Sequence, residues 1–118
     1  MNKDPLVWFT DHDCKVLHLK DYRHERDRKP AVDKKIEDPD IINKLIHDIE
    51  QIPTNGDLMI KFGPDVSHLT LVFQCGGGAQ IIHFYDERLK TPSTGFNTGG
   101  DALEKEKHLW NYIRSLLK

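Results

Sequence analysis

The order of short apolar segments along the chain predicts an α+β fold with a mainly antiparallel sheet. Two alternating segments come first, followed by a charged stretch, a capped helix, three more alternating segments and a closing amphipathic helix. Most neighbouring strand segments are separated by hairpin-sized turns, which favours antiparallel pairing. A chain of 118 residues is one domain of ordinary size. We therefore expect a single domain over residues 1–118, with about five strands and both helices packed on one face of the sheet.

The first two strands are expected to form a hairpin. Residues 6–10 are rich in aromatic and β-branched side chains, and residues 15–20 alternate polar with apolar positions. Residues 11–13, Asp-His-Asp, have turn chemistry. This pairing places Cys14 and Cys75 on different hairpins. Because no apolar leader follows the N-terminal Met-Asn-Lys-Asp-Pro, we expect the chain in the cytoplasm and both cysteines as reduced thiols.

A charge-dense stretch separates the first hairpin from the first helix. Residues 20–37 carry seven basic and five acidic side chains, which gives a local net charge of +2 (7 − 5). Few apolar side chains are available to pack there, so we expect a solvated and mobile connection. Residues 35–37 are the part of it that can extend along a sheet edge.

The first helix is expected to begin at Asp38 and Pro39. Asp caps free backbone amides, and Pro suits the first helical position. Residues 53–56, Pro-Thr-Asn-Gly, end the helix. Between these limits, apolar side chains recur at helical spacing on one face: Ile41, Ile42, Leu45, Ile46 and Ile49.

Three strands and a second helix complete the expected domain. The strands are expected over residues 58–62, 68–74 and 80–85, with a glycine triplet forming the last hairpin turn. After a loop, Asp101 and Glu104 form a capping box that predicts the start of the second helix. Its apolar side chains are Leu103, Leu109, Trp110, Ile113, Leu116 and Leu117.

One acid–base cluster can be drawn on the expected sheet. His68 and His83 lie on neighbouring strands, and Asp86 and Glu87 follow the second of them. Such residues could serve a small hydrolase or nuclease if they converged in a cleft. Sheet-surface histidines also pack across strands without catalysing anything. We therefore expect no catalytic residue, and we keep the hydrolase or nuclease as an alternative.

Composition and motifs exclude several other classes of function. No cysteine or histidine spacing fits a zinc site, and no glycine-rich segment fits a phosphate loop, so neither a metal nor a cofactor is expected. A formal charge of −2 gives no global attraction to nucleic acid, which we do not expect as a partner. No apolar run reaches the length of a membrane helix, so a membrane is not expected either.

Two segments carry a resemblance to a known class of protein. They are residues 36–42, Ile-Glu-Asp-Pro-Asp-Ile-Ile, and residues 90–96, Lys-Thr-Pro-Ser-Thr-Gly-Phe. With the general character of a short, charged α+β domain, they make the chain resemble small bacterial immunity proteins of contact-dependent inhibition and polymorphic-toxin systems. The resemblance implies tight binding to a cognate toxin domain, whose active site is thereby blocked.

We therefore expect a non-catalytic protein-binding domain, with an immunity protein as the preferred interpretation. Charge complementarity would make its association fast and selective. A homodimeric structural or regulatory protein, built through an uncovered sheet face or edge, is a further alternative. The residues expected to contact a partner protein are Tyr22, Arg23, Arg26, Arg28, Asp40, Asp48, Glu50 and Phe96.

Overall fold

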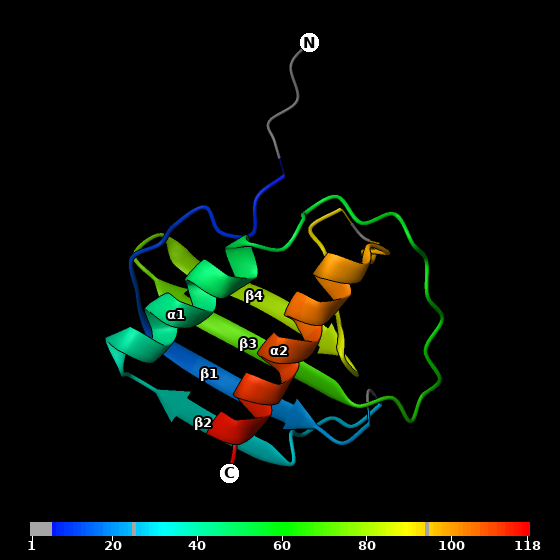
Figure 1. Ribbon diagram of the computed structural model, residues 1–118. Coiled ribbons are helices and arrows are strands. Elements are labelled where there is room, and N and C mark those ends of the chain that lie inside the picture. The colour runs from blue at the N-terminus through cyan, green and yellow to red at the C-terminus, as the bar shows by residue number, and fades with distance from the viewer. Residues whose placement is uncertain (1–5, 25, 94) are drawn as a thin grey trace.

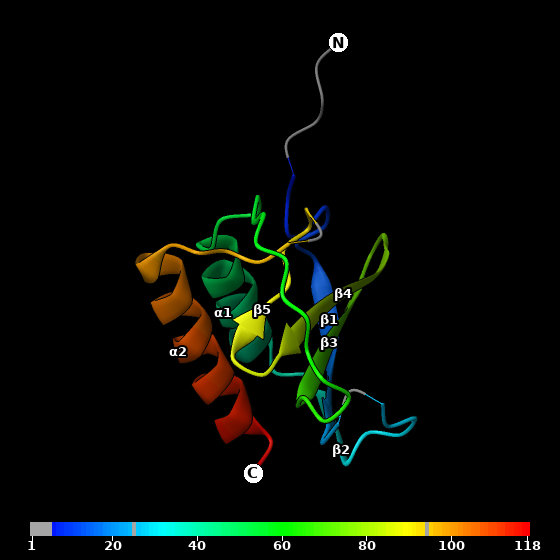
Figure 2. The same ribbon diagram turned by 90° about the vertical axis from the view of Figure 1, so that its right-hand side faces the viewer.

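The computed structural model describes residues 6–24, 26–93 and 95–118 (Figure 1). Over these residues the chain forms strands β1 (Cys14–Tyr22), β2 (Val32–Ile36), β3 (His68–Cys75), β4 (Gly78–Tyr85) and β5 (Arg88–Leu89), and helices α1 (Pro39–Glu50) and α2 (Gly100–Leu116). The strands make one antiparallel sheet in the order β2-β1-β3-β4-β5. Both helices cover the same face of this sheet (Figure 2). The expected α+β class and helix placement are confirmed.

The hydrophobic core lies between the sheet and the two helices. Successive side chains of a strand point to opposite faces, so every second residue of β1, β3 and β4 points toward the helices. The intervening residues point to the other face, which no helix of the described chain covers. We call it the helix-free face. Core side chains with no exposed surface include Leu17, Leu19, Ile42, Leu45, Ile49, Leu69, Leu71, Phe73, Phe84 and Ile113.

Two expected strands are absent from the sheet of the described residues. Residues 6–10 run outside it, and there the Trp8 indole Nε1 donates to the Ile52 carbonyl at 2.7 Å. Residues 58–62 belong to a long segment that arcs around one side of the sheet, where Leu58 forms an isolated bridge with Phe96 (Figure 1). Of the apolar side chains in these two segments, Phe9 is buried, while Leu58 and Met59 are exposed. Strand-like composition alone does not reveal that a segment lacks strand partners.

Much of the charged stretch instead belongs to the sheet. Its first residues lengthen β1 as far as Tyr22, and residues 32–36 form β2. The prediction of a solvated and mobile connection is therefore wrong for both ends of the stretch. The prediction that residues near 35–37 extend along a sheet edge is confirmed, because β2 is the edge strand and ends at Ile36. The exposed charges of Asp33, Lys34 and Lys35 protect that edge from pairing with another chain.

The two helix starts differ in how well they were predicted. The carboxylate of Asp38 accepts the backbone N–H of Asp40 at 2.9 Å, and Pro39 opens α1 as expected. The capping box of Asp101 and Glu104 is wrong, because the N-cap of α2 is Gly99, two residues before Asp101, and it makes no side-chain hydrogen bond.

The prediction of two reduced thiols is also wrong. Cys14 and Cys75 form a disulfide between directly paired positions of β1 and β3. The expected hairpin of residues 6–10 with 15–20 hid this pairing, because it gave β1 a different neighbour. The expectation of a cytoplasmic location loses the support of reduced thiols and remains a proposal. No helix in the described part of the chain has the length and apolar character that crossing a membrane requires.

Candidate functional site

The helix-free face carries the candidate site, which is built from regular strand pairing. Because β1, β3 and β4 are paired along their lengths, their outward side chains stand in rows across the sheet. From one end of the sheet the rows are Tyr22, His68 and Tyr85, then Lys20, Thr70 and His83, then His18, Val72 and Ile81.

A shallow groove of about 380 Å³ opens on these rows, and we call it the sheet groove. Its floor comes from the three strands, and the loop between β1 and β2 adds an acidic and a basic side chain to its wall. Lined in this way, the groove combines polar, aromatic and apolar groups, which is the usual make-up of a binding surface. The residues that line it are Lys20, Tyr22, Asp27, Arg28, His68, Thr70, Val72, Ile81 and His83.

Three polar atoms converge on the floor of the sheet groove, and we call His68, Thr70 and His83 the imidazole cluster. His68 Nε2 lies 3.0 Å from His83 Nδ1, and Thr70 Oγ1 lies 3.2 Å from the first nitrogen and 3.3 Å from the second. Partial burial lowers the pKa of His83, and the positive charges of His68 and Lys90 lower it further. The uncharged form of His83 is therefore favoured at neutral pH.

A column of stacked rings borders the imidazole cluster. The ring of Tyr22 stacks on His68 at 5.4 Å between centroids, His68 stacks on Tyr85 at 4.7 Å, and Tyr85 stacks on Phe62 at 5.5 Å. The rings thus turn their faces toward one another along the column. Single-stranded nucleic acids need open ring faces on which bases can stack, and within the column these faces are already in contact.

The structure brings together only part of the predicted acid–base cluster. His68 and His83 meet as described, whereas Asp86 and Glu87 lie exposed at the turn between β4 and β5. Asp86 has a positive φ of 56°, and its backbone N–H donates to the Ser67 carbonyl at 2.7 Å. Among the contacts of the described residues, neither of the two carboxylates reaches an imidazole of the cluster.

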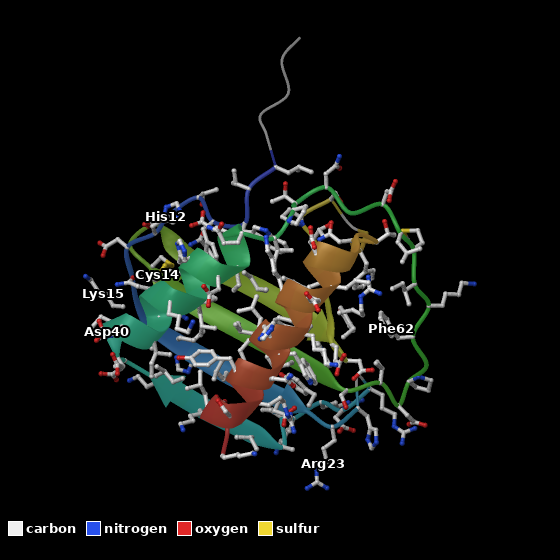
Figure 3. All side chains as sticks on the ribbon, in the orientation of Figure 1. His12, Cys14, Lys15, Arg23, Asp40 and Phe62 are labelled. Carbon is white, nitrogen blue, oxygen red and sulfur yellow. A yellow bond between two sulfur atoms is a disulfide. The ribbon has the colours of Figure 1, made fainter. Side chains whose placement is uncertain are left out.

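The four partner-contact residues expected in the charged stretch lie around one end of the sheet. Tyr22 and Arg28 line the sheet groove. Arg26 pairs with Asp65 at 3.2 Å. Arg23 is exposed and points away from the body of the molecule (Figure 3).

The remaining predicted contacts lie elsewhere. Asp40 is exposed in the first turn of α1 (Figure 3). Glu50 pairs with His12 at 2.7 Å, and Asp48 pairs with Lys44 at 2.9 Å. These acids are on the helix side of the molecule, where Asp48 also lines a groove of about 440 Å³ between α1 and α2. The predicted residues therefore do not form one continuous surface.

Phe96 does not fit the role of a contact residue. It is only 5% exposed, and its ring packs edge-on against Phe62 and Tyr85. Its burial follows from the bridges that its backbone forms with Leu58 and Lys90, which fix the loop against the sheet. The prediction that Phe96 is presented to a partner is corrected accordingly.

Several residues of the site were missed by the sequence reasoning. Lys20, Thr70 and Ile81 show no motif, and only the strand register places them beside the histidines. The sequence did carry one usable signal, the alternation of polar and apolar residues along β1 and β3. This alternation places every second side chain of a strand on the same face of the sheet. Within the described ranges, no group of three or more His, Cys, Asp or Glu side chains is placed to hold a metal ion.

Comparison of the chain with protein-family models, curated proteins and solved structures finds no match. The assignment of the site therefore depends on its geometry and charge.

Proposed function

We propose that the chain is a non-catalytic protein-binding domain that docks through its helix-free face. The observation that carries the proposal is the position of Ile81, which is 55% exposed in the middle of a paired strand. It lines both the sheet groove and a neighbouring hollow of about 290 Å³. Val7, 46% exposed, lines the same hollow. Adjoining exposed apolar residues with a polar surround are typical of protein interaction sites.

The charged surround supports selective binding. Lys20 and Arg28 line the sheet groove, and Lys90 lines the neighbouring hollow. Such positive groups at the rim of an apolar contact accelerate and select the encounter with an acidic partner surface. Tyr22 adds a rigid aromatic ring, a type of side chain that often anchors protein interfaces.

The finer part of the proposal is that this domain is an immunity protein, which acts in the cytoplasm and neutralises a cognate toxin domain. Its support is the resemblance in general character described for the sequence. Asp40, Asp48 and Glu50 on the helix side remain candidate contacts for a second, basic part of such a partner.

The proposal is tested by capture with matched surface variants. Tagged wild-type chain, Ile81→Glu and Met59→Glu are each incubated with a lysate of the source cells, and bound proteins are identified by mass spectrometry. Met59 is 77% exposed on another part of the surface, so its variant adds the same charge away from the groove. We expect one stoichiometric partner that carries a toxin or enzyme domain, retained by Met59→Glu and lost by Ile81→Glu.

Other outcomes separate the alternatives. Equal capture by both variants, with circular dichroism showing that each is folded, contradicts docking through the helix-free face. A wild-type chain that is dimeric by light scattering and becomes monomeric in Ile81→Glu supports the homodimeric alternative instead. A captured enzyme that stays fully active in the complex contradicts the immunity role.

The hydrolase or nuclease remains a second candidate because His68 and His83 meet in an open groove. On this proposal His83→Ala abolishes turnover of a phosphodiester substrate while the fold is retained. The absence of turnover by the wild-type chain, with divalent metals supplied, contradicts it. The present geometry favours binding over catalysis, since the facing imidazole nitrogens contact each other and the two predicted carboxylates lie apart from them.

A further inference from the structure

The first part of β4 has no strand along its outer edge. β5 pairs with β4 only at Phe84 and Tyr85, beside the end of β4 (Figure 2). The last backbone contact on that side is the Lys90 N–H, which donates to the His83 carbonyl at 3.1 Å. Among the described residues, the start of β4 therefore has a strand partner on one side only, which is β3.

The backbone groups left open on this side belong to Ala79 and Ile81. In an antiparallel strand the N–H and C=O of one residue point toward one neighbouring strand, and those of the next residue point toward the other. Because the His83 carbonyl points outward to Lys90, the groups of Ile81 and Ala79 point outward as well. Neither residue has a backbone hydrogen bond to a described residue on that side, and both are exposed. We call their outward N–H and C=O groups the β4 edge.

The β4 edge lacks the features that keep the opposite edge of the sheet from pairing. Natural sheets protect an exposed edge with charged side chains or proline. β2 presents Asp33, Lys34 and Lys35 at its edge, whereas β4 contains no Asp, Glu, Lys, Arg or Pro. An unprotected edge of this kind can accept a further strand.

The free groups and their surroundings favour an extended, partly acidic segment. A helix bonds its own N–H and C=O groups internally, whereas an extended chain can pair with the β4 edge along its length. The neighbouring hollow of about 290 Å³ runs beside this edge, with apolar lining from Val7 and Pro92. Lys90 also lines it and, in the described part of the chain, pairs with no acid.

We propose that an extended segment of a partner protein adds to β4 as a further strand, with an apolar residue against Ile81 and an acidic residue beside Lys90. The inference rests on the proposed docking function and specifies the form that the partner takes at this part of the surface. A second copy of the chain is not the proposed occupant, because its own β4 carries no acidic side chain for Lys90.

The proposal is tested with a peptide probe, Thr-Val-Thr-Glu-Thr-Val with both ends blocked. As a strand, the probe has its threonines on one face and its valines and glutamate on the other. It is titrated into the isotope-labelled chain, and the backbone amide signals are followed by NMR. We expect saturable shifts that are larger for Ala79 and Ile81 than for Gln80 and Ile82, whose N–H groups face β3.

Two N-methylated forms of the probe are the matched controls. One carries the methyl groups on the amides of its threonines, and the other carries them on the amides of its valines and glutamate. Only one of these sets faces β4 in an added strand, so one form should lose binding and the other should keep it. A probe with lysine in place of glutamate should bind more weakly, because it repels Lys90.

A pair of variants at Ala79 tests the same contact from the side of the protein. Ala79→Pro removes an outward N–H without removing a bond to β3, and Ala79→Val keeps that N–H. We expect Ala79→Pro to weaken probe binding about tenfold or more, because a carbonyl of the added strand then lacks its donor. Ala79→Val should bind as the wild type does. Circular dichroism checks that both are folded, and the N-methylated probes do not depend on either variant.

Capture from the cell lysate separates this inference from the docking function. Loss of the partner by Ile81→Glu but not by Ala79→Pro means that the partner docks through side chains of the helix-free face, so strand addition is wrong and the docking function stands. Retention by both variants contradicts the docking function itself.

Four other results would overturn strand addition. The first is no saturable response to the unmodified probe at millimolar concentrations. The second is equal binding of the two N-methylated probes. The third is hydrogen exchange at the Ile81 amide that is as slow as at Ile82 in the free monomer, which means that the edge is already paired. The fourth is a dimer in which the β4 edge is protected from exchange, which assigns the edge to a second copy.

Discussion

At the scale of single residues, Glu106 of α2 is the acidic group whose environment departs most from water. The side chain has no exposed surface, its Oε1 accepts the backbone N–H of Leu89 at 2.7 Å, and the same oxygen lies 3.7 Å from Arg88 Nε. Burial raises the pKa of Glu106, and the Leu89 N–H and Arg88 oppose that rise. Position 106 lies at helical spacing from Leu109 and Ile113 on the buried face of α2, so the apolar repeat carried a signal for its burial that the sequence reasoning did not use.

The raised pKa of Glu106 predicts a pH dependence of stability. The native chain binds the Glu106 proton more tightly than the unfolded chain does, so the free energy of unfolding should fall as the pH rises above the ordinary glutamate pKa of about 4.3 and through the native value. Glu106→Gln removes this contribution and keeps an oxygen that can accept from Leu89. Urea unfolding at a series of pH values checks this, and parallel profiles for the two proteins would contradict it.

At the scale of elements, locally determined features were predictable and pairings were not. The start and the apolar face of α1 are determined by residues close together in sequence, namely Asp38, Pro39 and the apolar repeat that follows them. This helix can therefore be predicted without knowing how the rest of the chain folds. Which strand pairs with β1 depends on contacts distant in sequence, and residues 6–10 looked like the nearest partner. The candidate site shows the same division. The sequence placed His68 and His83 on neighbouring strands, which the structure confirms, but only the turn geometry places Asp86 and Glu87 away from them.

The disulfide between β1 and β3 should contribute to the stability of the sheet. It closes a long loop, because its two cysteines are separated by 61 residues in sequence. A double variant, Cys14→Ala with Cys75→Ala, should lower the free energy of unfolding by about 2–4 kcal/mol, chiefly by loosening the unfolded chain. Denaturant unfolding measures the loss. Equal stability of the variant and the oxidised wild type would show that this cross-link adds nothing to the paired strands.

The uncapped start of α2 offers a stabilising change. Gly99 has an ordinary φ of −71°, and a side chain added there would meet no atom within 4 Å. Gly99→Ser should raise the free energy of unfolding by about 0.5–1 kcal/mol. The serine restricts the conformations of the unfolded chain, and its hydroxyl oxygen can accept a hydrogen bond from a backbone N–H in the first turn of α2. Thermal unfolding measures the gain, and Gly99→Ala separates the two effects because it lacks the hydroxyl.

At the scale of the whole molecule, the sheet has one face that stabilises the fold and one that is available for binding. Two neighbours in β4 stand on opposite faces: Ile82 is 4% exposed and Ile81 is 55% exposed. The sequence shows both as isoleucines in one apolar run, so the difference between them emerges only when helices cover one face. The same division separates the core from the sheet groove and explains why the predicted contact residues scatter over several surfaces.

Alanine at these two neighbours tests that division. Ile82→Ala should lower the free energy of unfolding by about 2–5 kcal/mol because it leaves a cavity in the core. Ile81→Ala should change it by less than about 1 kcal/mol, since much of that side chain is already in water. Denaturant unfolding of both variants provides the comparison, and comparable losses would mean that the helix-free face is also packed.

The link between Cys14 and Cys75 also makes a covalent ring that contains β2, α1 and the long segment leading to β3. Exposed loops are where proteases cut folded chains, and the segment around Met59 is such a place. A single cut within the ring severs the backbone but leaves both pieces attached to each other. A nicked molecule should therefore migrate as one species until a reductant is added, and α1 should remain tethered to the sheet after the chain has been cleaved.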